Sequence, residues 1–184
     1  LDRRVPICLR ARGFAHLDAA TSLNNFGLLL HDLGDPAAAR LLYERALAID
    51  EKVLGTEHPL TAIDYNNLGF LLQDMGELMA ARQHYERALA IRERVLGPEH
   101  PDTARSLAGL GLLLTEEGKL DEALTLMRRS LNILNKTLGA AHPDTKKVRN
   151  HLQVIEKEAS AHRAAIQHRK AAKKEKHKRK KMRR

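Results

Sequence analysis

The chain has 184 residues, of which 43% are hydrophobic and only 3% aromatic, so aliphatic side chains must build its core. Its single cysteine, Cys8, excludes an intramolecular disulfide and a cysteine-based metal cage. The formal net charge is +9, but residues 161–184 hold twelve Lys or Arg and one acid, so the basicity belongs to that segment. Because no apolar run approaches the roughly 18 residues that cross a bilayer and no signal-peptide pattern begins the chain, we expect an intracellular, cytoplasmic protein without a membrane contact.

The sequence repeats itself every 42 residues. The positions that recur in register include Gly27, Gly69 and Gly111, then Gly34, Gly76 and Gly118, and the dipeptides His58-Pro59, His100-Pro101 and His142-Pro143. A fixed period in this range predicts a stack of small units in which each unit contacts its neighbours. Stacked units create a long surface, which favours binding of another protein as the function.

In chain order, the period divides the sequence into six segments. They are residues 1–16, the remnant of a preceding repeat; 17–58, repeat 1; 59–100, repeat 2; 101–142, repeat 3; 143–168, a capping helix; and 169–184, a basic tail that is either disordered or a frayed helix. The capping helix is expected because one apolar stripe continues beyond residue 143 with no second helix after it, and stacked repeats require a cap.

Each repeat is predicted to contain two antiparallel helices. In repeat 2, apolar residues recur every three to four positions on both sides of Gly76, as in amphipathic helices. Pro59 is suited to the first turn of a helix, and Gly76 to the left-handed residue that ends one. The pattern predicts first helices near 18–33, 60–75 and 102–117, and second helices near 36–54, 78–96 and 120–138.

Three glycines lie inside the predicted first helices, at Gly27, Gly69 and Gly111. Each costs about 1 kcal/mol relative to alanine, so a packing reason is required. Small residues recur in the second helix of each unit at Ala39, Ala81 and Ala123. We therefore expect glycine to face alanine, which allows the two helices to approach closely.

The pattern Leu68-Gly69, Gly76, Ala81, Tyr85 and Ala88 resembles the tetratricopeptide repeat. The longer 42-residue unit, with Asn66-Asn67-Leu68-Gly69 and the stretch Leu96–Pro101, is similar to the kinesin-light-chain subclass. The resemblance implies an all-α fold, a right-handed α-solenoid of stacked antiparallel helix pairs (a TPR superhelix) that ends in the C-terminal capping helix.

The resemblance also implies that the first helices line a concave groove that binds a peptide. The residues expected to face it are Asn24, Asn25, Leu28 and His31 in repeat 1, Ile63, Asn66, Asn67, Phe70 and Gln73 in repeat 2, Arg105 and Leu112 in repeat 3, and Lys147 and Asn150 in the cap. Asparagine both donates and accepts, so it can pair with a peptide backbone of any sequence. The apolar residues would contact ligand side chains, and the two cations favour a ligand with acidic residues.

An alternative remains open for the asparagine pairs, namely that they cap local backbone groups or form ladders between units. In repeat 3 the pair is replaced by Ala108-Gly109, which interrupts any continuous row of asparagines. The acids Asp32, Asp74 and Glu116 are expected at the rim of the groove, so its net charge is left open.

The recurring His-Pro dipeptides do not predict a metal centre. Equivalent positions in successive units are about 20 Å apart, from helix spacings of 8–10 Å, whereas zinc needs ligands within about 2 Å of the ion. The sequence contains no nucleophile–base–acid set, phosphate-binding glycine loop or paired-carboxylate signature. We therefore expect no catalytic residues, no metal, no cofactor and no enzyme activity.

The basic tail has three open interpretations. It is a solvated charge run, a nuclear-import segment in a eukaryote through Lys178, Arg179, Lys180 and Lys181, or a salt-sensitive contact with nucleic acid or an acidic surface. No aromatic residue in the tail offers base stacking, so nucleic-acid contact is expected through this tail only and without sequence specificity.

The function predicted from the sequence is a protein–protein interaction scaffold, or adaptor, that binds a peptide or protein segment in its concave groove. One alternative is a protein associated with nucleic acid or acidic surfaces through its tail. Another is the sensor or regulatory repeat region of a larger signalling protein. The sequence leaves open the identity of the partner and the oligomeric state.

Overall fold

The computed structural model describes the backbone of residues 5–182, and the side chains of residues 18–171, 173 and 174. This part of the chain forms helices joined by short loops. The helices are α1 (Val5–Asp32), α2 (Pro36–Val53), α3 (Pro59–Asp74), α4 (Leu78–Val95), α5 (Pro101–Glu116), α6 (Leu120–Thr137) and α7 (Pro143–Met182). The predicted all-α fold is therefore confirmed, and the ends of α2 to α6 lie within two residues of the predicted ones.

Local chemistry explains where the helices begin. Pro59 and Pro101 stand in the first turn of α3 and α5, where the missing N–H of proline costs nothing. The preceding histidines accept a hydrogen bond from the backbone at the start of the helix, as Nδ1 of His58 does from the N–H of Leu60 at 3.2 Å. The same bond recurs at His100 and His142. The repeated His-Pro dipeptides therefore cap helices.

Glycines with positive φ end the helices and turn the chain. Gly76 has φ 78° and Gly97 has φ 95°, a conformation that side chains rarely adopt. After Gly76, the N–H of Glu77 returns to the carbonyl of Leu72 at 2.8 Å, which satisfies a group at the end of α3. The chain can thus reverse direction within three to five residues, and each helix packs beside the one before it.

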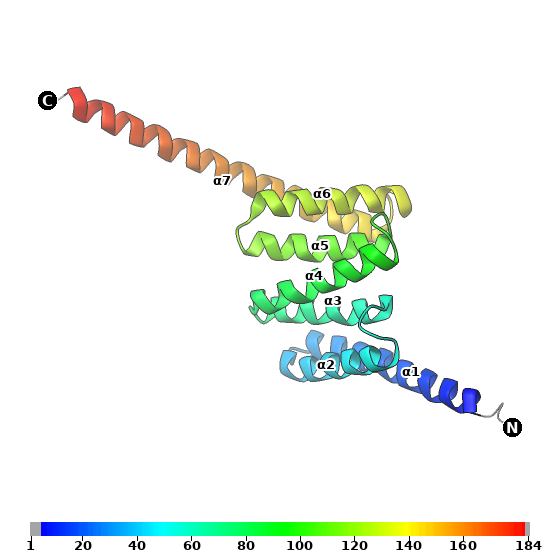
Figure 1. Cartoon of the computed structure of the whole chain (residues 1–184). Helices are drawn as coiled ribbons and strands as arrows, with labels where there is room; N and C mark the ends of the chain where they lie inside the picture. The colour runs from blue at the N-terminus through cyan, green and yellow to red at the C-terminus, as the bar shows by residue number, and fades with distance from the viewer. Residues whose placement is uncertain (1–4, 183–184) are drawn as a thin grey trace.

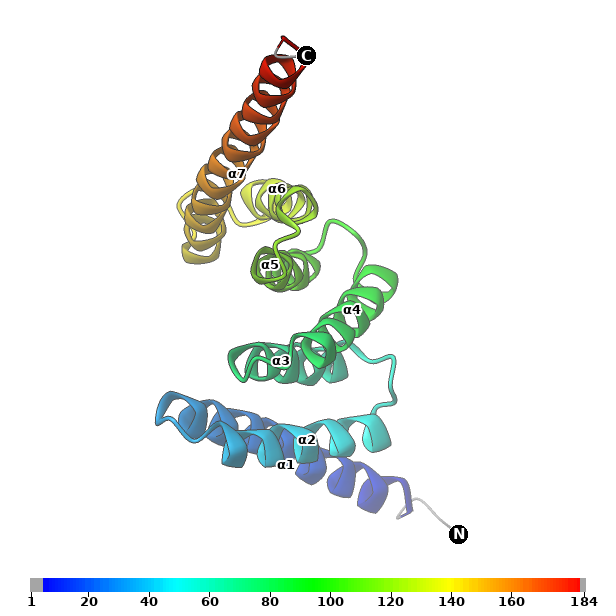
Figure 2. The same ribbon diagram turned by 90° about the vertical axis from the view of Figure 1, so that its left-hand side faces the viewer.

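The helices form a curved stack of antiparallel pairs, α1 with α2, α3 with α4, and α5 with α6, while α7 packs on α6 and touches α5 (Figures 1 and 2). Aliphatic residues such as Leu107, Leu113 and Ile133 are fully buried between them. Each such side chain contributes about 1.5–3 kcal/mol by leaving water. In the end-on view, α3, α5 and the beginning of α7 follow one another along the inner side of the curve (Figure 2).

Two of the three mid-helix glycines face tyrosine rings and the third faces a methionine, whereas alanine was the expected neighbour. A Cβ atom at Gly27 would lie 2.9 Å from the ring of Tyr43, and one at Gly69 would lie 3.0 Å from the ring of Tyr85. In repeat 3, a Cβ at Gly111 would meet the side chain of Met127, with the backbone of an alanine further away. Large side chains of the second helix therefore occupy the space that each glycine leaves empty.

Both terminal helices extend beyond the stack. The predicted boundary between residues 1–16 and repeat 1 lies inside α1, which runs without interruption from Val5. Likewise, α7 passes through the predicted boundary at residue 169 as a continuous helix (Figure 1). Its buried residues are confined to the first part, where Val148, Leu152, Ile155 and Ala159 face the stack, and every described side chain after Ala159 is exposed.

Candidate functional site

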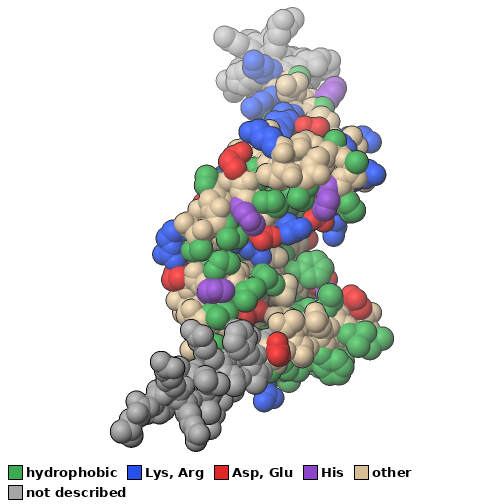
Figure 3. Space-filling view, turned by 90° about the vertical axis from the view of Figure 1, so that its right-hand side faces the viewer, with side chains coloured by type: hydrophobic (Ala, Val, Ile, Leu, Met, Phe, Trp, Pro, Cys, Tyr) green, Lys and Arg blue, Asp and Glu red, His purple; other side chains and the backbone are tan. Residues whose placement is uncertain are grey.

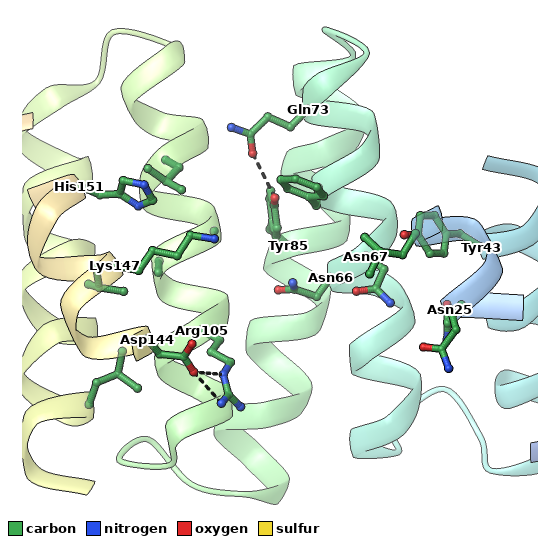
Figure 4. Close-up of a pocket in the computed structure, with 18 residues that line it drawn as sticks. Asn25, Tyr43, Asn66, Asn67, Gln73, Tyr85, Arg105, Asp144, Lys147 and His151 are labelled. Atoms are coloured by element: carbon green, nitrogen blue, oxygen red, sulfur yellow. Dashed lines mark hydrogen bonds and ion pairs between the residues drawn. The ribbon is translucent and has the colours of Figure 1, made fainter. Parts of the chain in front are cut away.

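The inner side of the stack contains a pocket of about 370 Å³, lined by α1, α3, α5 and α7 together with residues from second helices (Figure 4). It lies where the first helices come together along the curve. Most of the predicted groove residues line it: Asn24, Asn25, Leu28, Asn66, Asn67, Phe70, Gln73, Arg105, Leu112 and Lys147. One pocket thus brings together residues that are more than 120 positions apart in the sequence.

Three predicted residues lie outside the lining of this pocket. His31 places Nε2 3.0 Å from a carboxylate oxygen of Asp74, and its ring packs edge-on against Phe70 with centroids 5.3 Å apart. Its position therefore supports Phe70 from the side. Ile63 and Asn150 are exposed but are not among the pocket residues.

The floor of the pocket includes Tyr43 and Tyr85 of the second helices, which were not among the residues predicted to face the groove. Tyr85 lies between two glycines of successive repeats, because a Cβ at Gly109 would stand 2.7 Å from its ring. The tyrosine consequently reaches the groove through a gap between first helices. Gly109, which had been read as a break in the asparagine row, is the residue that provides this gap.

The other residues missed were Gly109, Leu134, Asp144, Val148 and His151. Most belong to α5 and α7, where the family pattern was followed at only a few positions. One signal in the sequence could have pointed to Tyr85. Gly109 stands where repeat 2 has the polar Asn67, and a glycine at a groove position leaves room for a neighbouring side chain.

A chain of hydrogen bonds connects one rim of the pocket to its floor. The hydroxyl of Tyr85 donates to Oε1 of Gln73 at 3.1 Å, and the Gln73 amide donates to Glu116 of the next first helix. Burial of Tyr85 raises its pKa, so its hydroxyl stays protonated as a donor. Because Gln73 is already engaged on both sides, it holds the rim together and has less freedom to bind a ligand.

Two cations were expected at the positive end of the groove, and one of them forms no ion pair with the described residues. Arg105 donates from Nε and Nη2 to Asp144 at 3.0 and 2.7 Å, and it also contacts Asp102, so its charge is balanced (Figure 4). Lys147 extends toward the pocket and forms no ion pair with the described residues (Figure 4). Burial and the nearby Lys147 ammonium lower the pKa of His151, which is therefore neutral near pH 7. The prediction of two free cations is corrected to one.

The asparagines divide into two roles. The Asn24 amide donates to Asp64 of the next repeat, and Oδ1 of Asn66 accepts from the hydroxyl of Ser106 at 3.4 Å. These two side chains therefore join successive repeats, as the alternative interpretation anticipated in part. Asn25 and Asn67 form no side-chain hydrogen bond within the described chain and line the pocket. They are the amides left to pair with a ligand.

The described surface is polarised along the stack. Lys and Arg side chains gather toward the C-terminal end, and apolar side chains are exposed toward the N-terminal end (Figure 3). On α7, Arg163, Arg169, Lys170, Lys173 and Lys174 are all exposed. The predicted cluster of Lys178, Arg179, Lys180 and Lys181 belongs to α7, but its side chains lie outside the described residues.

Neither a metal-binding cluster nor a membrane-spanning helix is present among the described residues. They contain no group of three or more His, Cys, Asp or Glu side chains arranged to hold a metal ion. None of the described helices is long and apolar enough to span a membrane.

Stacked helix pairs around a concave pocket define a helical-repeat protein of the solenoid class. The family model of the tetratricopeptide repeat matches residues 7–52, 18–72 and 63–136. These matches together cover more than half of the chain, so it belongs to the tetratricopeptide repeat family.

Solved structures of the same fold include kinesin-light-chain proteins. BtubC (BKLC) from P. vanneervenii is 24% identical over 77% of this chain and 56% of its own, with a TM-score of 0.69. A candidate kinesin light chain from Podosopora anserina with nearly identical TPR-like repeats is 27% identical over 73% of this chain and 64% of its own, with a TM-score of 0.68. The chain thus spans less than two thirds of either structure. The comparison with curated proteins found no match.

A third similar structure contains a bound peptide. It is the first TPR of Spaghetti (RPAP3) bound to the HSP90 peptide SRMEEVD, 16% identical over 78% of this chain and 94% of its own, with a TM-score of 0.57. At this identity the likeness extends to the fold alone.

Proposed function

We propose that this protein is an interaction scaffold that binds an extended segment of another protein in the pocket on the inner side of its stack. The observation that carries the proposal is the convergence of four helices on one concave space, with exposed apolar and amide side chains facing it. Tetratricopeptide repeats are interaction modules, and one structural relative holds a peptide. Concave, mostly apolar sites with a few polar groups are typical of ligand binding.

The apolar part of the proposed contact lies in the middle of the groove. Leu28 and Phe70 are 48% and 45% exposed, although both point into a concave surface where water is readily displaced. Leu112 continues this surface on α5 and is half-buried. Covering such side chains contributes about 25 cal/mol per Å² of apolar area. An apolar ligand side chain therefore fits between α1, α3 and α5.

The polar part of the proposed contact sets the ligand's direction. Asn25 and Asn67 offer unpaired amides beside the apolar surface, and an amide can pair with the backbone of an extended segment. Lys147 supplies a positive charge at the α7 end, where a carboxylate of the ligand would be matched. The proposed ligand is thus extended, with an apolar residue near its middle and an acid toward α7.

The proposal is tested by selecting peptides from a random library displayed on phage and measuring their affinity by fluorescence anisotropy. We expect Asn67→Ala with Phe70→Ala to reduce binding of a selected peptide at least about tenfold, from the loss of one apolar contact and one hydrogen bond. Met79→Ala, at an exposed position (73%) outside the pocket, is the matched control and should leave binding unchanged. Equal binding by the double variant and the control would contradict the proposal.

A second candidate function is supported by α7. Its described part beyond Ala159 is an exposed helix that carries five Lys or Arg, which suits nucleic acid or another acidic surface. Phosphate contacts of this kind release counterions, so affinity for a duplex oligonucleotide should fall steeply with salt. Deleting residues 169–184 should abolish this binding and leave peptide binding in the pocket intact. A flat salt response would exclude it.

A further inference from the structure

The three junctions between successive units use the same three positions with different chemistry. Each joins one residue of a first helix, one of the following second helix and one of the next first helix. The α2/α3 junction consists of Asn24, Asp50 and Asp64; the α4/α5 junction of Asn66, Arg92 and Ser106; and the α6/α7 junction of Ala108, Leu134 and Val148. Each member is separated from its equivalent by the 42-residue period.

The α2/α3 junction buries two carboxyl groups against each other. Asp50 is 5% exposed and Asp64 is fully buried, and the two carboxyl groups are near enough to affect each other's pKa. The Asn24 amide donates to Oδ1 of Asp64. Oδ1 of Asn24, Oδ1 of Asp50 and Oδ2 of Asp64 are buried and have no hydrogen-bond partner within the described part of the chain. Two adjacent buried carboxylates cannot both ionise cheaply, so the arrangement accommodates one shared proton.

The groups around the pair favour retention of that proton. Glu51 on α2 adds negative charge near Asp64 and is bonded to the hydroxyl of Tyr65 on α3. The opposite influence comes from the Asn24 amide on Asp64, and from Asp64 and then His58 on Asp50. Desolvation is the largest cause and raises the pKa of both acids, that of Asp64 to about 7. The proton is therefore lost within the physiological range.

The other two junctions carry no titrating acid. At the α4/α5 junction, Nη1 of Arg92 donates to the hydroxyl of Ser106 at 2.8 Å and to the carbonyl of Asp102 at 3.0 Å. Burial lowers the pKa of Arg92, but a guanidinium remains charged at any pH that the fold survives. Leu134 and Val148 make the α6/α7 junction apolar and buried. A pH change therefore acts on one junction of the three.

We propose that the α2/α3 junction is a proton-dependent hinge, closed while Asp50 and Asp64 share a proton and loosened when both are ionised. Ionisation places two negative charges at a junction where neither acid forms an ion pair with the described residues, and separation of α1 and α2 from α3 relieves the repulsion. Asn24 both belongs to the junction and lines the pocket, and Asn25 and Leu28 follow it on α1. Movement of α1 therefore removes one wall of the pocket, a consequence for ligand binding that rests on the proposed function.

The direction of the effect follows from linkage. An acid whose pKa is raised by folding binds its proton more tightly in the folded state than in the unfolded state. The stabilisation is complete below the ordinary pKa, about 4 for an aspartate, and is lost as the pH rises through the folded value of about 7. The hinge is therefore closed in mildly acidic solution and loosened above neutrality.

Hydrogen exchange of the full chain, measured by mass spectrometry and corrected for the intrinsic pH dependence of exchange, tests the hinge. We expect opening of α1 and α2 to increase at least about tenfold between about pH 5.5 and pH 8.5, while α5 and α6 change little. Asp50→Asn with Asp64→Asn, which leaves no titrating acid at the three junction positions, should remove the difference. Because this variant keeps His58 and every other histidine, it separates the pair from histidine titration.

A second variant without the acid pair tests the hinge if the first variant does not fold. Asp50→Arg with Asp64→Ser copies the α4/α5 junction and should also give exchange in α1 and α2 that is independent of pH. The proposal is overturned by a wild-type protein whose α1 and α2 exchange equally at both pH values, by the same change throughout α5 and α6, or by a dependence that persists in a folded variant.

Binding of a peptide selected for the pocket tests whether the hinge controls the pocket, and it separates this proposal from the proposed function. The affinity of wild type is expected to fall about tenfold or more over the same pH interval, and that of Asp50→Asn with Asp64→Asn to stay constant. If exchange changes with pH but affinity does not, the coupling to the pocket is overturned. A protein that binds no peptide at any pH contradicts the proposed function, while the exchange result still decides the hinge.

Discussion

The α2/α3 and α4/α5 junctions have equivalent backbones and opposite electrostatics. One buries an acid pair that must hold a proton, and the other buries an arginine that donates to neutral oxygens. A repeat protein keeps the packing residues of each unit because the neighbour must fit, but a buried polar position is restricted only by its immediate partners. A solenoid can therefore have regular geometry and junctions of different chemistry.

The two junctions also differ in how a tyrosine meets the next repeat. Tyr85 packs against Gly109 at the α4/α5 junction, whereas the residue equivalent to Gly109 one repeat earlier is Asn67, near Tyr43. The glycine lets a buried ring sit closer to the next first helix. The α4/α5 junction is thus tightened both by packing and by the Arg92 hydrogen bonds.

The largest effect is expected from placing an acid in the α4/α5 junction. Arg92→Asp removes two buried donors and faces a carboxylate toward the carbonyl of Asp102, which should destabilise the protein by roughly 3 to 5 kcal/mol. Urea unfolding followed by circular dichroism measures this change. Arg94→Asp, at an exposed position on the same helix, is the control and should cost far less. Equal losses would mean that the burial of Arg92 is unimportant.

A smaller effect is expected from transferring the asparagine of repeat 2 into repeat 3. Gly109→Asn adds a Cβ that would stand 2.7 Å from the Tyr85 ring, which is 2% exposed and has little room to move. Overpacking of this kind costs about 1–3 kcal/mol. The double variant with Tyr85→Leu should recover part of the loss in urea unfolding, because the ring is then absent. If the double variant recovers none of the lost stability, Gly109 has a role other than making room for the Tyr85 ring.

The smallest effect is expected from the two histidine caps. His58→Ala and His100→Ala each remove an equivalent cap, at 3.2 and 3.1 Å, so both should lose about 0.5–2 kcal/mol. The two variants differ in the acid beside each histidine, since His58 influences the buried Asp50, whereas His100 lies 3.7 Å from the partly exposed carboxylate of Asp102. Thermal unfolding between about pH 5 and 8.5 should therefore show a larger change of profile for His58→Ala than for His100→Ala. Equal changes in the two profiles would mean that His58 does not act on the acid pair.

The repeat period predicted most of the fold because each signal was local. Pro59 begins a helix and Gly76 ends one by conformations that these residues alone impose, so the boundaries between them followed directly. The length of α1 was not predictable in this way. Gly13 and His16 lie 42 residues before Gly55 and His58, but no proline follows them to begin a new helix, and α1 continues through them.

The groove was predicted only where a first-helix position repeats. Asn67 and Phe70 were found by register, but Tyr85 was missed since it enters the pocket from a second helix through the gap at Gly109. The pairing of Arg105 with Asp144 depends on which residues of α5 and α7 come together, and one sequence does not contain that distance. The Asp50 and Asp64 pair was likewise invisible, because neither residue is unusual until both are buried.

The central claim is that the pocket between α1, α3, α5 and α7 binds the ligand. The most direct test is the NMR spectrum of the full chain, with assigned side-chain amides, titrated with a peptide selected from the displayed library. We expect the side-chain amide signals of Asn25 and Asn67 and the ring signals of Phe70 to shift on binding. The backbone amide signals of residues 169–174 should not shift. Shifts confined to α7 beyond Ala159, with the two amides unchanged, would contradict the claim.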